Sequence, residues 1–88
     1  MKPLNYAVLK YFTSVPEACA DDVIKALQQE YGRFKALNEK DVLNALMTAK
    51  ANGLLEESRF EEASSNGVRV YFRAHAEGAA TINRYIPD

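Results

Sequence analysis

Residues 37–72 constrain the fold of this chain more than any other part of the sequence. Asn38 has the side chain of a helix N-cap, and Gly53 can end the following helix in the left-handed conformation that glycine adopts at little cost. Apolar and polar residues then alternate from Val68 to Arg73, which is the pattern of a half-buried strand. The segment therefore predicts a helix, a strand, a tight Ser-Ser-Asn-Gly turn and a second strand, at residues 39–52, 54–60, 64–67 and 68–72.

The rest of the chain predicts three more helices, at residues 4–14, 20–31 and 77–85. The first has an apolar stripe at helical spacing and cannot continue past Pro16. The second has Asp21 and Asp22 in its first turn, where carboxylates favour the positive end of the helix dipole. The expected fold is α+β: a three-helix core, a two-stranded hairpin and a short C-terminal helix, in one domain over residues 1–88.

Length and composition fit one small domain without an enzyme cleft. The 88 residues are 48% hydrophobic and 26% charged, which is typical of an ordinary globular protein. No apolar run approaches the roughly 20 residues of a membrane-spanning helix, and the start of the chain lacks the features of a signal peptide. With Cys19 as its one cysteine, the chain can form no internal disulfide. We therefore expect a cytoplasmic protein with no membrane partner.

The charge balance is slightly acidic. The chain has 11 Lys and Arg against 12 Asp and Glu, a net charge of −1, and its pI is about 5.8. DNA affinity rests largely on cationic side chains that displace counterions from phosphates, and a pI above about 9 would favour it. The composition lowers the expectation of tight nonspecific DNA binding, although a basic face can coexist with an acidic back.

The order of the predicted elements resembles the winged helix-turn-helix DNA-binding superfamily, in particular PadR-like and MarR-like bacterial regulators. Leu46–Leu55 looks like the passage of those families in which a small-residue helix end is followed by Gly and two apolar residues. Tyr71–Gly78 is similar to their Tyr-x-Leu-Thr-x-x-Gly phrase, with Ala74 and His75 in place of Leu-Thr. The resemblance implies that the third helix enters the major groove and that the hairpin acts as a wing.

On the third helix, Lys40, Asn44 and Thr48 are the candidates for reading bases. Asn44 would pair with adenine, Lys40 would reach guanine or phosphate, and Thr48 would touch a thymine methyl group. The family usually has Ser, Thr and Arg near the start of this helix, whereas this chain has Glu39 and Asp41. The alternative is that the three polar residues only form a solvated helix face.

On the second strand, Arg69 and Arg73 flank Tyr71 on one face and are candidates for gripping phosphates. Arg33 and Lys35, in the loop before the third helix, would add further phosphate contacts. The competing interpretation pairs the two strand arginines with acidic residues of the other strand, Glu57, Glu61 or Glu62.

A protein partner is the alternative to DNA. Leu43 and Met47 flank the predicted recognition face, and they are either core residues covered by neighbouring elements or an exposed contact for a protein. If the chain binds DNA, so few cations imply weak binding per monomer and a homodimer formed through Tyr85 and Ile86 of the closing helix. A third hypothesis is a structural domain that only self-associates.

Catalysis is not predicted. His75 has no neighbouring cysteine for a dyad, no His/Cys spacing fits a zinc site, and we expect His75 at the surface or at a strand end. Cys19 is either a small structural residue before the second helix or a redox-sensing thiol with a lowered pKa. We expect no enzyme activity, cofactor or metal. The leading hypothesis is a small bacterial or phage winged-helix DNA-binding transcriptional regulator, and a winged-helix protein–protein interaction module is the alternative.

Overall fold

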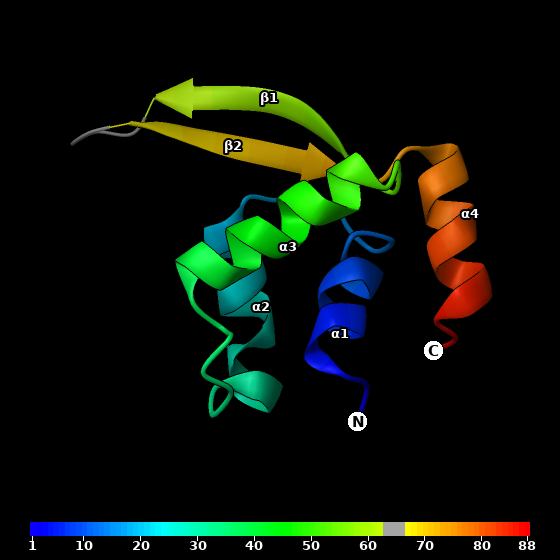
Figure 1. Cartoon of the computed structure of the whole chain (residues 1–88), viewed down its shortest axis with the longest axis horizontal. Coiled ribbons are helices and arrows are strands. Elements are labelled where there is room, and N and C mark those ends of the chain that lie inside the picture. The colour runs from blue at the N-terminus through cyan, green and yellow to red at the C-terminus, as the bar shows by residue number, and fades with distance from the viewer. Residues whose placement is uncertain (63–66) are drawn as a thin grey trace.

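The computed structural model describes residues 1–62 and 67–88, and in them it shows four helices and one two-stranded antiparallel hairpin (Figure 1). The elements are α1 Leu4–Tyr11, α2 Ala20–Tyr31, α3 Glu39–Ala51, β1 Glu56–Glu62, β2 Val68–Arg73 and α4 Ala76–Tyr85. The α+β class and the order of elements agree with the prediction, and the arrangement is compatible with a winged helix. Of the predicted turn, Ser64, Ser65 and Asn66 lie outside the described residues, and Gly67 has a φ of 91°. No helix in the described ranges has the length and apolar character needed to cross a membrane.

Three predicted boundaries were wrong by two or three residues: the end of α1 and both ends of β1, which reaches Glu62 and not Phe60. α1 ends at Tyr11 and not at Ser14, because the backbone N–H groups of Phe12, Thr13 and Ser14 bond to carbonyls three residues back, in tight turns. β1 begins at Glu56 and not at Leu54, because the Leu54 N–H is still bonded to the end of α3, at Ala49 O.

Both ends of α3 form as the sequence predicts. The side chain of Asn38 accepts a hydrogen bond from the Asp41 N–H at 2.9 Å. At the other end Gly53 has a φ of 78°, its N–H bonds to Lys50 O at 3.0 Å, and the Leu54 N–H bonds to Ala49 O at 2.9 Å. These two bonds are a complete Schellman motif, which satisfies carbonyls that would otherwise be left open at the helix end.

The core is shared by the four helices and β2. Figure 1 shows α1 and α2 below α3, the hairpin above it, and α4 beyond α1, and α4 packs against α1. The largest fully buried side chains are Phe12, Phe72, Leu46, Ile82, Val23 and Val42. Phe72 therefore anchors the hairpin to the helices. Its backbone N–H and C=O also exchange hydrogen bonds of 2.9 Å with Ala18, just before α2.

The hairpin has one irregularity that decides which side chains meet. Glu61 faces Arg69 and Phe60 faces Val70, but the register shifts between Glu57 and Arg59. One extra residue on β1 makes this a β-bulge, and beyond it Glu56 faces Arg73.

Candidate interaction surface

α3 buries only one side. Val42, Leu46 and Ala49 lie in the core, whereas Leu43 and Met47 are 37% and 44% exposed. The interpretation of Leu43 and Met47 as core residues is therefore wrong, because α4 packs against α1 and does not cover α3. Their interpretation as an exposed apolar pair is confirmed.

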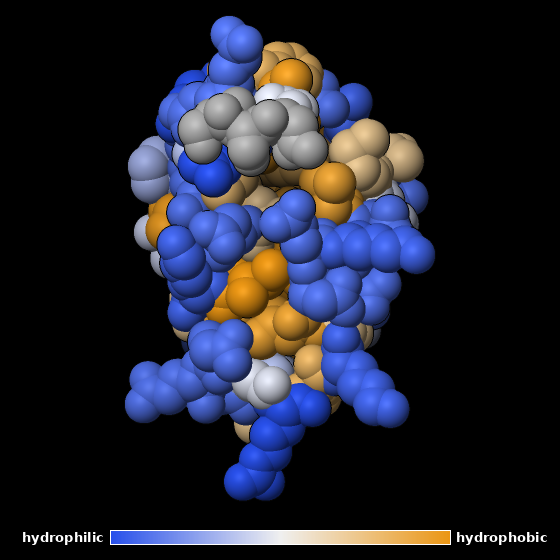
Figure 2. Space-filling view, turned by 90° about the vertical axis from the view of Figure 1, so that its left-hand side faces the viewer, coloured by the Kyte–Doolittle hydropathy of each residue, from blue (hydrophilic) through white to orange (hydrophobic). Residues whose placement is uncertain are grey.

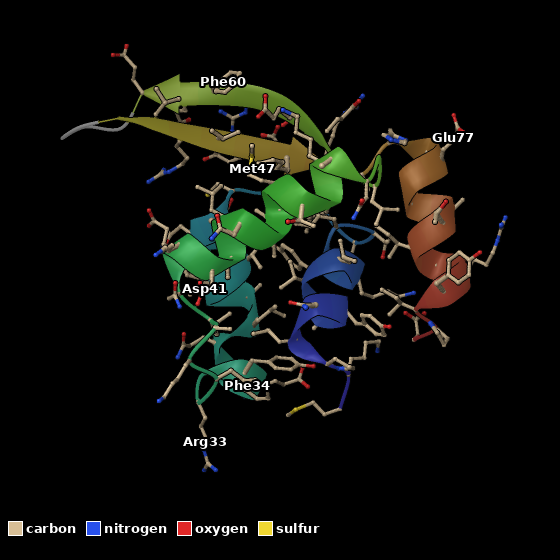
Figure 3. The ribbon with its side chains drawn as sticks, in the orientation of Figure 1. Arg33, Phe34, Asp41, Met47, Phe60 and Glu77 are labelled. Carbon is tan, nitrogen blue, oxygen red and sulfur yellow. The ribbon has the colours of Figure 1, made fainter. Side chains whose placement is uncertain are left out.

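The hairpin extends this exposed apolar surface. Phe60 is 62% exposed and Val68 is 58% exposed. Phe60 faces Val70 across the ladder, so the alternation of side chains places Phe60, Val68 and Val70 on the same face of the hairpin. In Figure 3, Met47 points from α3 toward the hairpin. We call the group Leu43, Met47, Phe60 and Val68 the apolar patch.

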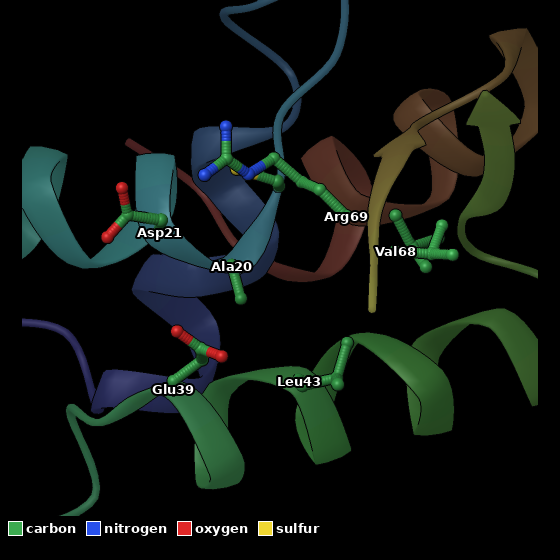
Figure 4. A pocket seen from close by; sticks show the side chains of 8 residues that line it. Ala20, Asp21, Glu39, Leu43, Val68 and Arg69 are labelled. Carbon is green, nitrogen blue, oxygen red and sulfur yellow. The ribbon is translucent and has the colours of Figure 1, made fainter. Parts of the chain in front are cut away.

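Part of this patch borders a hollow beneath the hairpin. Figure 2 shows hydrophobic side chains gathered in the middle of this face and framed by hydrophilic ones. The hollow has a volume of about 340 Å³ and is formed by β2, the start of α2 and the start of α3 (Figure 4). Its lining residues are Cys19, Ala20, Asp21, Glu39, Leu43, Val68, Arg69 and Val70.

The two wing arginines are paired with carboxylates. Arg69 lies 3.5 Å from Glu61, and Arg73 forms an ion pair with Glu56. Cross-strand pairing is therefore confirmed for Arg69 with Glu61. For Arg73 the expected partners were wrong, because the bulge moves Glu56 opposite it.

An ion-pair network that the sequence did not indicate joins the hairpin to the segment before α2. The guanidinium of Arg59 lies 2.7 Å from Glu17 and 3.1 Å from Glu61, and it stacks 3.9 Å from the centre of the Tyr71 ring. Hydrogen bonds from Ser58 and Arg59 hold the pKa of Glu17 below its usual value. The one available signal was the position of Arg59 near Tyr71 on the same face of the hairpin.

The helix candidates for base reading are all exposed: Lys40, Asn44 and Thr48. Asn44 and Thr48 line a second hollow together with residues of α1, so they lie on the side of α3 away from the hairpin. Leu43 and Val68, by contrast, share the hollow under the hairpin.

The loop cations do not join the wing arginines. Arg33 and Lys35 are exposed as predicted, but Figure 3 places Arg33 at the end of the molecule opposite the hairpin. The structure thus places Arg69 beside the start of α3, in one hollow with Glu39 and Leu43, and leaves Arg33 apart from it. Arg73 lies elsewhere, next to Glu56 and Glu17.

At the C-terminal end, only one of the two predicted contact residues is available. Tyr85 is 70% exposed, whereas Ile86 is 5% exposed and belongs to the core. The prediction that Ile86 contributes to an interface is wrong, because the chain turns it inward after α4, where Lys10 Nζ donates to its carbonyl at 2.7 Å.

Cys19 and His75 both have local structural roles. Cys19 is 3% exposed, and burial raises the pKa of its thiol, so the redox-sensing interpretation with a lowered pKa is wrong. Its backbone N–H donates to the Asp22 carboxylate at 3.1 Å, which helps to start α2. His75 is half-buried, lies two residues after the end of β2 and is the N-cap of α4, so its expected position near a strand end is confirmed and its capping role is added by the structure. The sequence feature that could have indicated the capping role is the position of His75 in the phrase Tyr71–Gly78, where the families that the chain resembles have Thr.

Comparison with known proteins adds no function to this geometry. The sequence matches no protein-family model and no curated protein. Within residues 1–62 and 67–88, no group of three or more His, Cys, Asp and Glu side chains is placed to hold a metal ion. The surface formed by α3 and the hairpin is therefore the candidate functional site.

Proposed function

We propose that this chain is a winged-helix-like module that binds a protein partner through α3 and the hairpin. The observation that carries the proposal is the apolar patch, whose four side chains are each more than a third exposed. Contiguous exposed apolar surface usually marks a protein contact, and the centres of such contacts are rich in aromatic residues and Met and poor in charge. Phe60 and Met47 fit that composition.

The outward stripe of α3 supports the same proposal. Leu43, Met47 and Ala51 succeed one another at about one helical turn, so they lie on one face, and all three are exposed. A helix that reads a DNA groove would be expected to present polar and cationic side chains on its exposed face. An apolar stripe instead suits packing against another protein surface.

The charged side chains around this stripe also support the proposal, because they resemble the polar rim of a protein interface. Lys50 pairs with Glu57 at 3.1 Å, and Arg69 and Arg73 are paired with β1 carboxylates. Over α3, β1 and β2 the carboxylates outnumber the cations. A phosphate backbone would meet this surface with little net attraction, whereas a protein interface tolerates a rim of paired charges.

The test is affinity capture of partners from an extract of the source cells. Met47→Asp places a charge in the apolar patch, and Tyr85→Asp makes the same kind of change on α4, outside it. We expect a partner that the wild type and Tyr85→Asp retain and that Met47→Asp loses, with all three folded by circular dichroism. Equal retention by the two variants, or no partner for the wild type, would contradict the proposal.

DNA binding as a transcriptional regulator is a second candidate function. It is supported by the exposure of Lys40, Asn44 and Thr48 on α3. Surface ion pairs contribute at most about 1 kcal/mol, so Arg69 and Arg73 can exchange a carboxylate for a phosphate.

This second candidate has its own test. Fluorescence anisotropy with labelled genomic duplexes should show affinity that falls steeply between about 50 and 200 mM salt. Replacing Arg69 and Arg73 with Ala should weaken it further. Absence of binding at the lowest salt, or binding that salt does not change, would count against DNA as the partner.

A further inference from the structure

The outer edge of β2 has backbone groups without partners. Phe72 directs both its N–H and its C=O to Ala18, on the side of β2 away from β1. In a regular strand these groups point to the same side at every second residue, so those of Val70 and Val68 also face this outer edge. The chain leaves the edge after Ala18 and enters α2 at Ala20. Among the described residues, nothing bonds to the N–H or C=O of Val68 and Val70 at this edge.

The space beside this edge is the hollow under the hairpin. Val68 and Val70 form one wall, and Ala20 and Leu43 line it from the two helices (Figure 4). The hollow, with a volume of about 340 Å³, lies beside the part of β2 that precedes Phe72, the residue bridged to Ala18. Neighbouring strands of a sheet lie about 4.8 Å apart. The hollow therefore occupies the place that a strand added to the outer edge of β2 would take.

We propose that the outer edge of β2 at Val68 and Val70 takes up an extended peptide segment of a partner protein as an added strand. The inference rests on the proposed protein-binding function and names the kind of segment bound. Unpaired N–H and C=O groups select an extended backbone, since both groups of each residue are satisfied only by another strand. The Ala18 bridge limits the added strand to a short one beside residues 68–70.

A second copy of β2 fits this edge less well than a short peptide whose two ends are not held in a hairpin. Two β2 strands that paired antiparallel over more than residues 68–70 would each have to extend past Val70 toward Phe72. On each copy that part of the edge is already taken by Ala18. The edge therefore favours a segment that is not itself part of this hairpin.

The lining of the hollow indicates which side chains the segment carries. Ala20 and Leu43 would contact an apolar side chain directed into the hollow. Figure 4 shows Asp21 and Glu39 facing the hollow from α2 and α3, with Arg69 reaching in from β2.

The charges in the hollow favour a basic residue on the segment. Asp21 is paired with Lys25 at 3.1 Å, and Arg69 lies 3.5 Å from Glu61. Glu39 has no ion-pair partner among the described residues. A Lys or Arg beside an apolar residue would complement Glu39 at the edge of the hollow.

The probe is a fluorescein-labelled six-residue peptide in which valine alternates with lysine. Binding is followed by anisotropy, and amide hydrogen exchange of the protein is measured by NMR with and without peptide. In the free protein, the amides of Arg69 and Tyr71 should be protected by β1, and those of Val68 and Val70 should exchange quickly. Saturating peptide should slow exchange at Val68 and Val70 at least tenfold.

Two variants of the experiment isolate the backbone bonds, namely peptide methylation and Val70→Pro, and a third, the valine–glutamate peptide, tests the charge of the segment. The same peptide with alternate backbone nitrogens methylated, and a valine–glutamate peptide, should each bind at least tenfold more weakly. Val70→Pro removes one edge donor but no bond to β1, and it should weaken binding to a similar degree, whereas Tyr85→Asp should not. Because methylation changes only the peptide, it remains decisive if Val70→Pro does not fold.

Absence of binding at millimolar peptide, equal binding of the methylated peptide, or unchanged exchange at Val68 and Val70 would overturn the inference. These outcomes are distinct from failure of the proposed function. If the proposed function failed, the capture experiment with wild type and Met47→Asp would show no partner whose binding depends on the apolar patch.

Discussion

The imidazole of His75 joins the start of α4 to the end of α3. Its Nδ1 accepts a hydrogen bond from the Gly78 N–H at 3.0 Å, and its Nε2 lies 3.0 Å from the backbone oxygen of Gly53. The first bond makes His75 the N-cap of α4, and the second fixes the ring against the glycine that terminates α3. One side chain thus connects the first turn of α4 to the glycine that ends α3.

Replacing His75 with Ala should destabilise the fold by about 1 kcal/mol, because the loss of an N-cap acceptor leaves an N–H of the first turn unpaired. His75→Ser restores an acceptor for Gly78 but not the contact with Gly53, so its stability should lie between those of the wild type and His75→Ala. Urea unfolding followed by circular dichroism measures the three proteins. A His75→Ala protein as stable as the wild type would show that the cap contributes nothing.

Gly78 allows α4 to approach the loop after α3 closely. A Cβ added at Gly78 would lie 2.1 Å from the Leu54 backbone oxygen, so Gly78→Ala forces the two segments apart. Overpacking of this kind typically costs about 1–3 kcal/mol, whereas Ala favours a helix over Gly by about 1 kcal/mol. We expect a net loss of stability in urea unfolding.

The matched control for this prediction is Ala80→Gly at an exposed position of α4. It should cost about 1 kcal/mol through helix propensity alone. If Gly78→Ala stabilised the protein while Ala80→Gly destabilised it, propensity would dominate and the close approach would not matter.

Gly53 tests a purely conformational cost. Its φ of 78° lies in the left-handed region, and nothing lies within 4 Å of a Cβ built there. Gly53→Ala should therefore lose about 1–2 kcal/mol with no steric clash, and Gly53→Asn should lose less, because Asn enters this region more readily. Thermal unfolding of the two variants measures the difference. Equal melting temperatures for wild type and Gly53→Ala would contradict the assignment of the cost to φ.

The ends of α3 could be predicted from the sequence because each depends on one residue and its own backbone. Asn38 caps the start and Gly53 ends the helix whatever packs around them. The same holds for the alternation along β2. Local signals of this kind located every element, with errors of a few residues at some ends.

The contacts between elements could not be predicted in the same way. If the pairing seen near the turn continued along the hairpin without a bulge, Arg73 would face Glu57. The one extra residue on β1 places Arg73 opposite Glu56 instead. The exposure of Met47 depends on α4 packing against α1, which no spacing within α3 indicates. Glu17 and Arg59 are far apart in the chain and meet only through the fold.

The Glu17 contact should make stability depend on pH in a known direction. Hydrogen bonds from Ser58 and Arg59 lower the pKa of this carboxylate in the folded state. Its contribution is therefore present above the unfolded-state pKa and is lost as pH falls through the folded pKa.

Glu17→Gln removes that contribution at every pH. The difference in unfolding free energy between wild type and Glu17→Gln should be largest near pH 7 and should shrink as the pH falls through the lowered folded-state pKa of Glu17, below which both side chains are uncharged. Urea unfolding at several pH values measures it. A difference that stayed constant with pH would mean that the ionised carboxylate does not stabilise the fold.

The buried thiol of Cys19 should react only when the protein opens. The side chain is 3% exposed, and burial raises its pKa, so both access and the fraction of thiolate are low in the folded state. Alkylation by iodoacetamide should be slow in native buffer and should accelerate with urea in step with unfolding measured by circular dichroism. The unfolded chain in concentrated urea provides the reference rate, because unfolding exposes Cys19 and leaves its thiol chemically unchanged. Native protein that reacts as fast as this reference would show that the segment before α2 opens without global unfolding, and the Ala18 bridge to Phe72 would then have to open with it.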